Sequence, residues 1–222
     1  MIHTGSFDKG IYKDCVFSLD FKEGSGNPND NAKAHHPMTM PSAPTWTTVS
    51  PAGIAVNVLD FNGAANYIQC AAASAVDLKF NATRTFTVAL WINPDTSPGA
   101  FRRVIGKGNN GWNFDSYLTG IYWGGPGYPV RADLAYFTGV WQMIALTDNN
   151  GAGKFYRNGI EPTYVLQNAV NPGDTADDFA IGGYAAGTFT DGKMYHPRIW
   201  SRALSPQEIW YIFQRERRLF GV

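Results

Sequence analysis

The chain of 222 residues is 44% hydrophobic and 16% charged, which fits one folded domain with a sizeable core and excludes a disordered segment. Its 18 basic and 18 acidic residues cancel, which argues against a nucleic-acid binder because such proteins carry a basic excess. No apolar run approaches the ~20 residues of a membrane-spanning helix, so membrane insertion is not expected. The 24 glycines, the 13 prolines and the 14% of aromatic residues favour an all-β fold with many turns.

Strand patterns recur along the chain at spacings of about ten residues. In the first, Cys15–Phe21, the side chains of Phe17, Leu19 and Phe21 alternate onto one face. Prolines then predict that residues 32–53 form a loop with short extended pieces. Further strands are expected at Ile54–Phe61, Tyr67–Ala71, Thr85–Ile92, Arg103–Gly106, Tyr117–Trp123, Trp141–Thr147, Lys154–Arg157, Asp178–Ile181 and Gly192–Trp200. This spacing favours a sandwich or a barrel.

One helix is predicted near the C-terminus, over residues 205–218. Ser205 is a suitable N-cap, Pro206 suits the first helical position, and Glu208 can reach back to the cap in a capping box. Apolar residues then recur at helical spacing, so this helix should lie against one sheet.

The two cysteines, Cys15 and Cys70, are too few for a disulfide framework. Both lie in apolar, strand-like patterns, which predicts buried free thiols in preference to a bridge.

Several segments together resemble the laminin-G-like, concanavalin-A-like jelly-roll family. The segments that carry the resemblance are Phe21–Gly26, Phe61–Gly63, Phe86–Pro94, Val104–Gly108, Trp141–Asp148, Lys154–Gly159 and Arg198–Ser205. They extend over most of the chain in the family's order. The resemblance implies two antiparallel sheets packed face to face, with the short C-terminal helix added. We therefore expect an N-terminal arm over residues 1–14 and a single sandwich domain over residues 15–222.

The fold family includes glycoside hydrolases, which need two carboxylates a few ångströms apart. Family members of this kind carry Glu-x-Asp-x-x-Glu on one strand, and that pattern is absent. The chain has only four glutamates, and none falls in the middle of an expected strand: Glu23, Glu161, Glu208 and Glu216. The histidines also lack metal-ligand spacing: they are His3, His35, His36 and His196. Asp191 and His196 are interpreted as structural. We expect a protein that is not an enzyme.

Many relatives in this family hold a structural calcium ion through an aspartate of the closing strand. Here Tyr195 stands at that position, and a phenol is a poor ligand for a hard cation. Asp20, Asp30 and Asp191 remain possible ligands. The departure from the family pattern predicts neither a calcium ion nor any other cofactor.

The most suggestive functional stretch runs from Trp112 to Asp133. Aromatic rings suit the C–H face of a sugar, and planar polar groups suit its hydroxyls. The candidate glycan-binding residues are Trp112, Tyr117, Trp123, Tyr128, Asn113, Asp115 and Arg131. The alternative is that some of these rings fill the core of the sandwich.

Two classes of function fit the chain, a glycan-binding module and a decorating surface protein, and both can hold at once. The N-terminus lacks the basic start and apolar stretch of a signal peptide. The chain, including its closing segment Arg217–Val222, resembles free-standing laminin-G-like proteins of bacteriophages. That favours a non-catalytic protein of the virion surface, made in the host cytoplasm and released by lysis. The expected partners are a glycan or host-surface polysaccharide, capsid or other virion proteins, and a second copy of the chain.

The alternatives are a secreted or cell-surface carbohydrate-binding module and a glycoside hydrolase. The missing carboxylate pair argues against the hydrolase. The arm over residues 1–14 carries apolar side chains that need a surface to bury them. It either packs on its own sandwich or docks on a neighbouring subunit or capsid protein.

Overall fold

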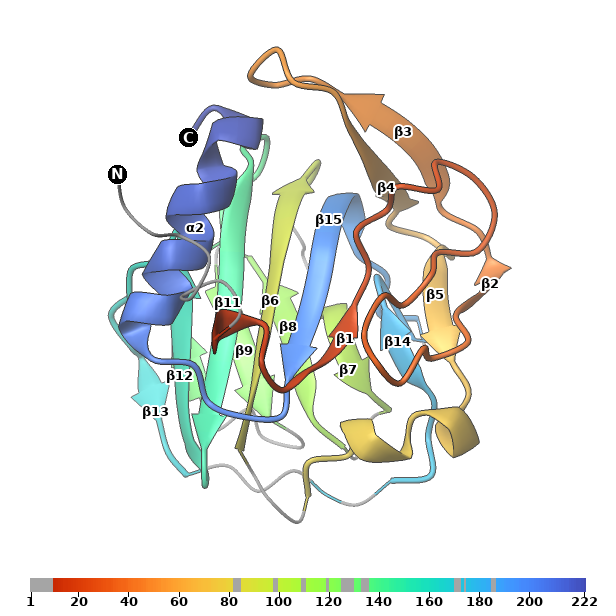
Figure 1. Ribbon diagram of the computed structural model, residues 1–222. Coiled ribbons are helices and arrows are strands. Elements are labelled where there is room, and N and C mark those ends of the chain that lie inside the picture. Colours follow the sequence, from red (N-terminus) through yellow and green to blue (C-terminus); the bar gives the residue numbers. More distant parts are fainter. Residues whose placement is uncertain are drawn as a thin grey trace.

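The computed structural model describes residues 10–81, 85–97, 100–108, 111–118, 120–124, 130–132, 136–169, 173, 175–184 and 187–222. It shows two antiparallel sheets packed face to face, with one helix against the outer surface of one of them (Figure 1). The predicted all-β jelly-roll sandwich with a C-terminal helix is confirmed. Among the residues described, no helix is long and apolar enough to cross a membrane.

The sheet that carries the helix is called the helix-side sheet. Its strand order is β12 (Ala152–Arg157), β11 (Gln142–Asn149), β6 (Thr85–Pro94), β15 (Asp191–Trp200), β4 (Val56–Asn62) and β3 (Thr45–Val49). β1 (Cys15–Ser18) pairs with residues 198–200 at the C-terminal end of β15, whereas β4 pairs with residues 191–194 at its N-terminal end.

The second sheet is called the far sheet, since it lies behind in Figure 1. Its order is β13 (Leu166–Gln167), β10 (Val130–Ala132), β9 (Gly120–Gly124), β8 (Asn113–Tyr117), β7 (Arg102–Lys107), β14 (Phe179–Ile181), β5 (Tyr67–Cys70) and β2 (Thr39–Ser42). Two short 3₁₀ helices, Ala72–Ser74 and Val76–Leu78, follow β5.

Strand β6 is buried on both faces because the molecule has three layers at this point. Phe86 and Leu90 point into the core between the sheets. Ala89 and Trp91 alternate toward the helix and belong to a second apolar cluster with it. A central strand that is covered on both faces has a nearly continuous run of apolar residues in its sequence, and residues 85–92 have such a run.

The C-terminal helix α2 spans Pro206–Phe220 and begins with the predicted capping box. The Glu208 backbone N–H donates to Ser205 Oγ at 3.3 Å, and the Ser205 backbone N–H donates to Glu208 Oε2 at 2.8 Å. The helix ends at Gly221, whose φ of 71° is left-handed. It runs two residues beyond the predicted end because Phe220 packs on the rings of Trp91 and Trp141, each at 4.4 Å.

One strand prediction needs correction. Residues 117–123 form no single strand; they belong to β8 and β9, joined by a tight turn in which Leu118 has a φ of 52°. Residues 32–53, predicted to be a loop with short extended pieces, contain the short strands β2 and β3, in agreement with that prediction. These strands are half exposed at the sheet edges, so they lack a clear apolar alternation, and Pro41 is tolerated in β2 because an edge strand needs no donor there. β10 and β13, two or three residues long, were not expected.

Both cysteines are free thiols, as predicted. Burial raises the pKa of Cys15 and that of Cys70 to about 11, so each is a thiol at neutral pH.

Residues 10–14 pack on the sandwich, although the sequence places them in the arm. Ile11 is 2% exposed and lies in the apolar cluster under α2. Its carbonyl oxygen accepts a hydrogen bond from Trp200 Nε1 at 2.8 Å. A deletion of residues 1–14 would therefore remove part of the folded unit. Ile2 and Phe7 of the arm lie outside the described residues.

Candidate functional site

The predicted functional stretch lies on the far sheet, where strand alternation divides it between two faces. In the β8–β9 hairpin, Phe114 pairs with Trp123, and Asp115 pairs with Tyr122. Phe114 and Trp123 lie in the core between the sheets. Because successive side chains point to opposite faces, Asp115, Tyr117 and Tyr122 lie on the outer face. We call this surface, on β7 to β10, the outer face of the far sheet.

Trp112 and Trp123 fill the core, which corrects their selection as glycan contacts. Both are 0% exposed. Trp112 Nε1 donates to the carbonyl oxygen of Leu78 at 2.6 Å, and the ring of Phe86 lies between the two indoles, 5.3 Å from Trp112 and 5.7 Å from Trp123. Neither indole can offer its ring face to a sugar in this structure. The alternative that these rings form the core is the one observed.

Three aromatic rings gather on the outer face. Phe101 stacks on Tyr117 with 4.9 Å between ring centroids, and its edge meets Tyr122 at 5.1 Å. Phe101 and Tyr117 are half exposed, whereas Tyr122 is buried beneath them. Arg131, the partner of Tyr122 in the β9–β10 register, places its guanidinium 5.8 Å from the Tyr122 ring centroid. The result is a partly exposed aromatic platform beside a half-buried cation.

A buried ion pair lies beside the platform on the same face. Arg103 Nε donates to Asp115 Oδ1 at 2.6 Å, and Arg103 also donates to the carbonyl oxygen of Gly108 at 2.9 Å. The half-buried ring of Tyr184 lies 5.8 Å from the same guanidinium. Asn113 and Asp115 are 3% and 1% exposed. Both side chains are therefore buried below the surface of the outer face and are not exposed on it.

The structure thus brings Tyr117, Arg131, Asn113 and Asp115 together on one face and places Trp112 and Trp123 on the other. Tyr128 lies outside the described residues. The sequence-based selection did not include Phe101, Arg103, Tyr122 or Tyr184, which also belong to this face. Tyr122 could have been found from its alternation with Trp123; the other three come from segments that only the folded chain brings together.

The model of one protein family matches residues 62–210, about two thirds of the chain, and that family is described as the concanavalin A-like lectin/glucanases superfamily. The chain belongs to this superfamily. The match runs from the end of β4 into α2 and so includes every strand of the outer face described above. No curated protein sequence matches the chain significantly.

Solved structures of the same fold include domain 4 of an extracellular arabinanase from Geobacillus stearothermophilus, in complex with arabinotriose. It has a TM-score of 0.63 and 18% identity, and the match covers 90% of this chain and 98% of that one. The binding domain of botulinum neurotoxin serotype D has a TM-score of 0.65 and 14% identity, with 93% and 53% covered. The chain therefore spans about half the length of that toxin domain.

A sialidase from Trypanosoma rangeli, in complex with sialic acid, has a TM-score of 0.68 and 16% identity, with 95% of this chain and 34% of that one covered. At these identities the likenesses establish the shared lectin-like sandwich fold.

The residues considered for calcium are engaged in other contacts. Both carboxylate oxygens of Asp30 accept hydrogen bonds, two from the backbone N–H groups of Ser18 and Ala32 and two from the backbone and ring of His36. Asp20 pairs with Lys22, and Asp191 accepts from Thr96 Oγ1 at 2.7 Å. Within the described ranges, no group of three or more His, Cys, Asp or Glu side chains could hold a metal ion. These residues do not fit a calcium site.

We therefore expect EDTA to change the melting temperature by no more than about 1–2 °C, because only an ion bound to the native state stabilises it by mass action. The measurement is a thermal melt with EDTA and with excess calcium. A fall of about 10 °C on chelation, reversed by calcium, would reveal a tightly held ion and contradict this expectation.

Proposed function

We propose that the protein is a non-catalytic glycan-binding module that binds its ligand on the outer face of the far sheet. The observation that carries the proposal is the stack of Phe101 on Tyr117, half exposed and next to the guanidinium of Arg131. A sugar ring presents C–H groups on its faces and hydroxyls at its rim. A binding site for it needs aromatic surface together with a few fixed hydrogen-bonding groups.

The polar groups beside the platform support a rigid site. Arg103 and Asp115 hold each other through a charge-assisted bond of 2.6 Å in a buried position. Such a pair fixes the backbone and side chains around it before a ligand arrives, so less ordering entropy is lost on binding.

The proposal that the module is non-catalytic rests on the use of its carboxylates. Each glutamate already has a structural partner: Glu23 accepts from the Asn29 backbone, Glu161 pairs with Lys154, Glu208 caps α2 and Glu216 pairs with Arg198. On the outer face, Asp115 is bound to Arg103. A glycosidase needs two carboxylates flanking the scissile bond, one of them able to donate a proton.

The test is a glycan array with the unmodified chain, followed by titration of the best ligand. We expect Tyr117→Ala and Phe101→Ala each to weaken binding at least about tenfold, since each removes half of the exposed stack. The matched control is Trp210→Ala, which removes an exposed aromatic side chain from α2 instead. The bound oligosaccharide should be recovered intact. Equal losses in all three variants, or cleavage of the ligand, would refute the proposal.

We propose the virion surface as the setting of this module, with capsid or other virion proteins as partners. Support comes from the resemblance of its motifs and closing segment to free-standing phage proteins. An antibody against the purified chain should label purified particles of the virus that encodes it. Labelling restricted to the cleared lysate would contradict the proposal. That result would favour the alternative of a secreted or cell-surface carbohydrate-binding module. The likeness to the arabinanase domain, which covers nearly the whole of both chains, supports this alternative.

A second copy of the chain is a further proposed partner, and the edge of the helix-side sheet supports it. Strand β3 is Thr-Trp-Thr-Thr-Val, without a charge or a proline, and among the described residues it pairs only with β4. Figure 1 shows it at the margin of the sheet. Natural edge strands are usually protected against pairing with another chain, and β3 has no charged residue, no proline and no bulge in its register with β4. Light scattering should give the mass of a dimer, and a monomer at high concentration would exclude it.

A further inference from the structure

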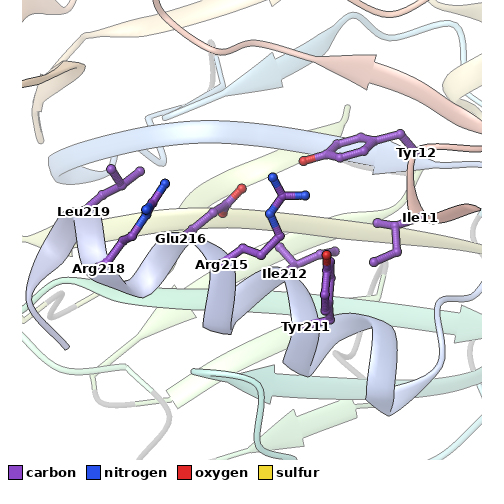
Figure 2. A pocket seen from close by; sticks show the side chains of 8 residues that line it. All are labelled: Ile11, Tyr12, Tyr211, Ile212, Arg215, Glu216, Arg218 and Leu219. Carbon is purple, nitrogen blue, oxygen red and sulfur yellow. The ribbon is translucent and has the colours of Figure 1, made fainter. Parts of the chain in front are cut away.

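A pocket separate from the outer face lies between helix α2 and the segment that precedes β1. Its volume is about 160 Å³, and it is lined by Ile11, Tyr12, Tyr211, Ile212, Arg215, Glu216, Arg218 and Leu219. Figure 2 shows Arg215, Glu216 and Arg218 projecting from α2 to the same side, with Arg215 nearest the ring of Tyr12 and Arg218 beside Leu219. The pocket lies on the side of the helix-side sheet that carries α2, so both sheets separate it from the outer face of the far sheet. The pocket and the outer face share no residue.

The one acidic residue in the lining is already neutralised. Glu216 accepts two hydrogen bonds from the buried guanidinium of Arg198, at 2.7 and 2.8 Å, and one from Trp91 Nε1 at 2.8 Å. Its carboxylate is therefore paired with Arg198 and does not repel an anion in the pocket as an isolated charge would.

The remaining polar groups of the lining can donate hydrogen bonds. Arg215 and Arg218 carry guanidinium groups, which have donors only. The hydroxyl oxygen of Tyr12 accepts from Arg198 at 3.5 Å, which leaves its own proton to donate elsewhere. Counting Arg198, Arg215, Arg218 and Glu216 with the negative end of the α2 dipole gives a local charge of about +1.5, so the dipole does not cancel the cations.

The rest of the lining is apolar or aromatic. Ile11, Ile212 and Leu219 line the walls together with the rings of Tyr12 and Tyr211. A volume of about 160 Å³ corresponds to about five water molecules at ~30 Å³ each, which is comparable to the six-membered ring of one monosaccharide. A free inorganic anion would leave these walls unused, and an extended peptide would not fit inside.

We infer that this pocket binds an acidic monosaccharide unit, a hexuronic acid residue, with its carboxylate between Arg215 and Arg218 and its ring against Tyr12 and Tyr211. Guanidinium groups bind carboxylates in a fork geometry, and the tyrosine rings suit the C–H faces of the sugar. The site does not depend on the proposed glycan-binding face, because neither its residues nor its layer of the fold are shared with it.

The test is an NMR titration of the full chain with methyl β-D-glucuronide and, as the neutral analogue, methyl β-D-glucoside. We expect the glucuronide to bind at least about tenfold more tightly than the glucoside. The double variant R215Q/R218Q should lose this preference. The matched control is Arg217→Gln on the same helix, whose guanidinium donates to the carbonyl oxygen of Val222 and does not line the pocket; it should bind within about twofold of the unmodified chain.

Four results would overturn the inference. The first is no binding of the glucuronide, or equal binding of the two sugars. The second is a loss in Arg217→Gln as large as in R215Q/R218Q, which would indicate unspecific attraction to a basic helix. The third is displacement by inorganic phosphate or by N-acetylglutamate amide at concentrations below those of the glucuronide, which would assign the pocket to a small anion or to an acidic protein side chain. The fourth is loss of glucuronide binding in Tyr117→Ala, which would move the site to the outer face.

Discussion

Replacing Glu216 with glutamine should lower the free energy of unfolding by about 3–5 kcal/mol, among the largest effects expected from a single substitution in this chain. Arg198 is 0% exposed, and among the described residues its carboxylate partner is Glu216. A neutral amide retains the shape of the side chain but leaves the guanidinium as an uncompensated buried charge. The substitution also weakens the bond from Trp91 Nε1 that ties β6 to α2. Denaturant unfolding measures the change.

Two further variants separate the buried charge from other causes. Adding Arg198→Met to Glu216→Gln should recover much of the lost stability, because an apolar side chain needs no counter-charge in this layer. Glu208→Gln is the matched control: it breaks the half-exposed pair with Arg202 at the start of the same helix, and should cost only about 1 kcal/mol. If Glu216→Gln costs no more than Glu208→Gln, the buried pair does not stabilise the fold as argued.

The same pair predicts how stability depends on acid. Burial disfavours the charged form of Glu216, but Arg198 and His196 outweigh it and lower the pKa of Glu216 to about 2. A carboxyl whose pKa is lower in the folded state stabilises it above the ordinary value near 4.5, and this contribution is lost as the pH falls from 4.5 toward 2. The shift corresponds to about 3 kcal/mol. The acid limb of the stability curve should therefore be shallower in Glu216→Gln.

The sequence was sufficient to predict the elements that local chemistry determines. The capping box at Ser205 and Glu208 depends on side chains three residues apart, and the structure contains both of its bonds. The Asn-Gly pair at 158–159 closes the resembling segment Lys154–Gly159 and favours a tight turn, and both residues have positive φ. The continuous apolar run of β6 marks a strand covered on both faces.

The candidate glycan-binding residues come from one stretch of the chain, and the structure divides them between two faces of the far sheet. If residues 117–123 were one strand, Tyr117 and Trp123 would share a face, since an even number of steps separates them. The turn after Tyr117 changes this relation: Tyr117 pairs with Gly120, and Trp123 pairs with the inward-facing Phe114. Periodicity alone cannot place such a turn, because the residues on both sides of it are apolar or aromatic.

Contacts between segments that are distant in the sequence could not be predicted for a different reason. Phe101 reaches the platform from outside the hairpin that carries Tyr117 and Tyr122. Arg198 and Glu216 lie on a strand and on a helix that meet only when α2 folds onto the helix-side sheet. Neither pairing has a local pattern that could predict it.

The assignment of faces leads to the second large effect, on Trp123. We expect Trp123→Ala to lower the free energy of unfolding by about 3–5 kcal/mol, because it removes a fully buried indole and leaves a cavity next to Phe86. Tyr117→Ala should have the opposite profile, with little loss of stability and a loss of glycan binding. Each variant is measured by urea unfolding and by titration with the array ligand under conditions where it is folded.

Trp123→Phe is the conservative control for this pair. Among the described residues, the indole N–H of Trp123 has no hydrogen-bond partner. Phenylalanine therefore removes a buried polar group that costs free energy while it retains most of the apolar volume, and should cost far less than alanine. If Trp123→Ala remains as stable as the unmodified chain but no longer binds glycan, then the indole is a ligand contact, and the division of the hairpin into a core face and a binding face is wrong. If Tyr117→Ala destabilises the fold as much as Trp123→Ala does, the aromatic platform is part of the core, and the proposed binding face loses its main support.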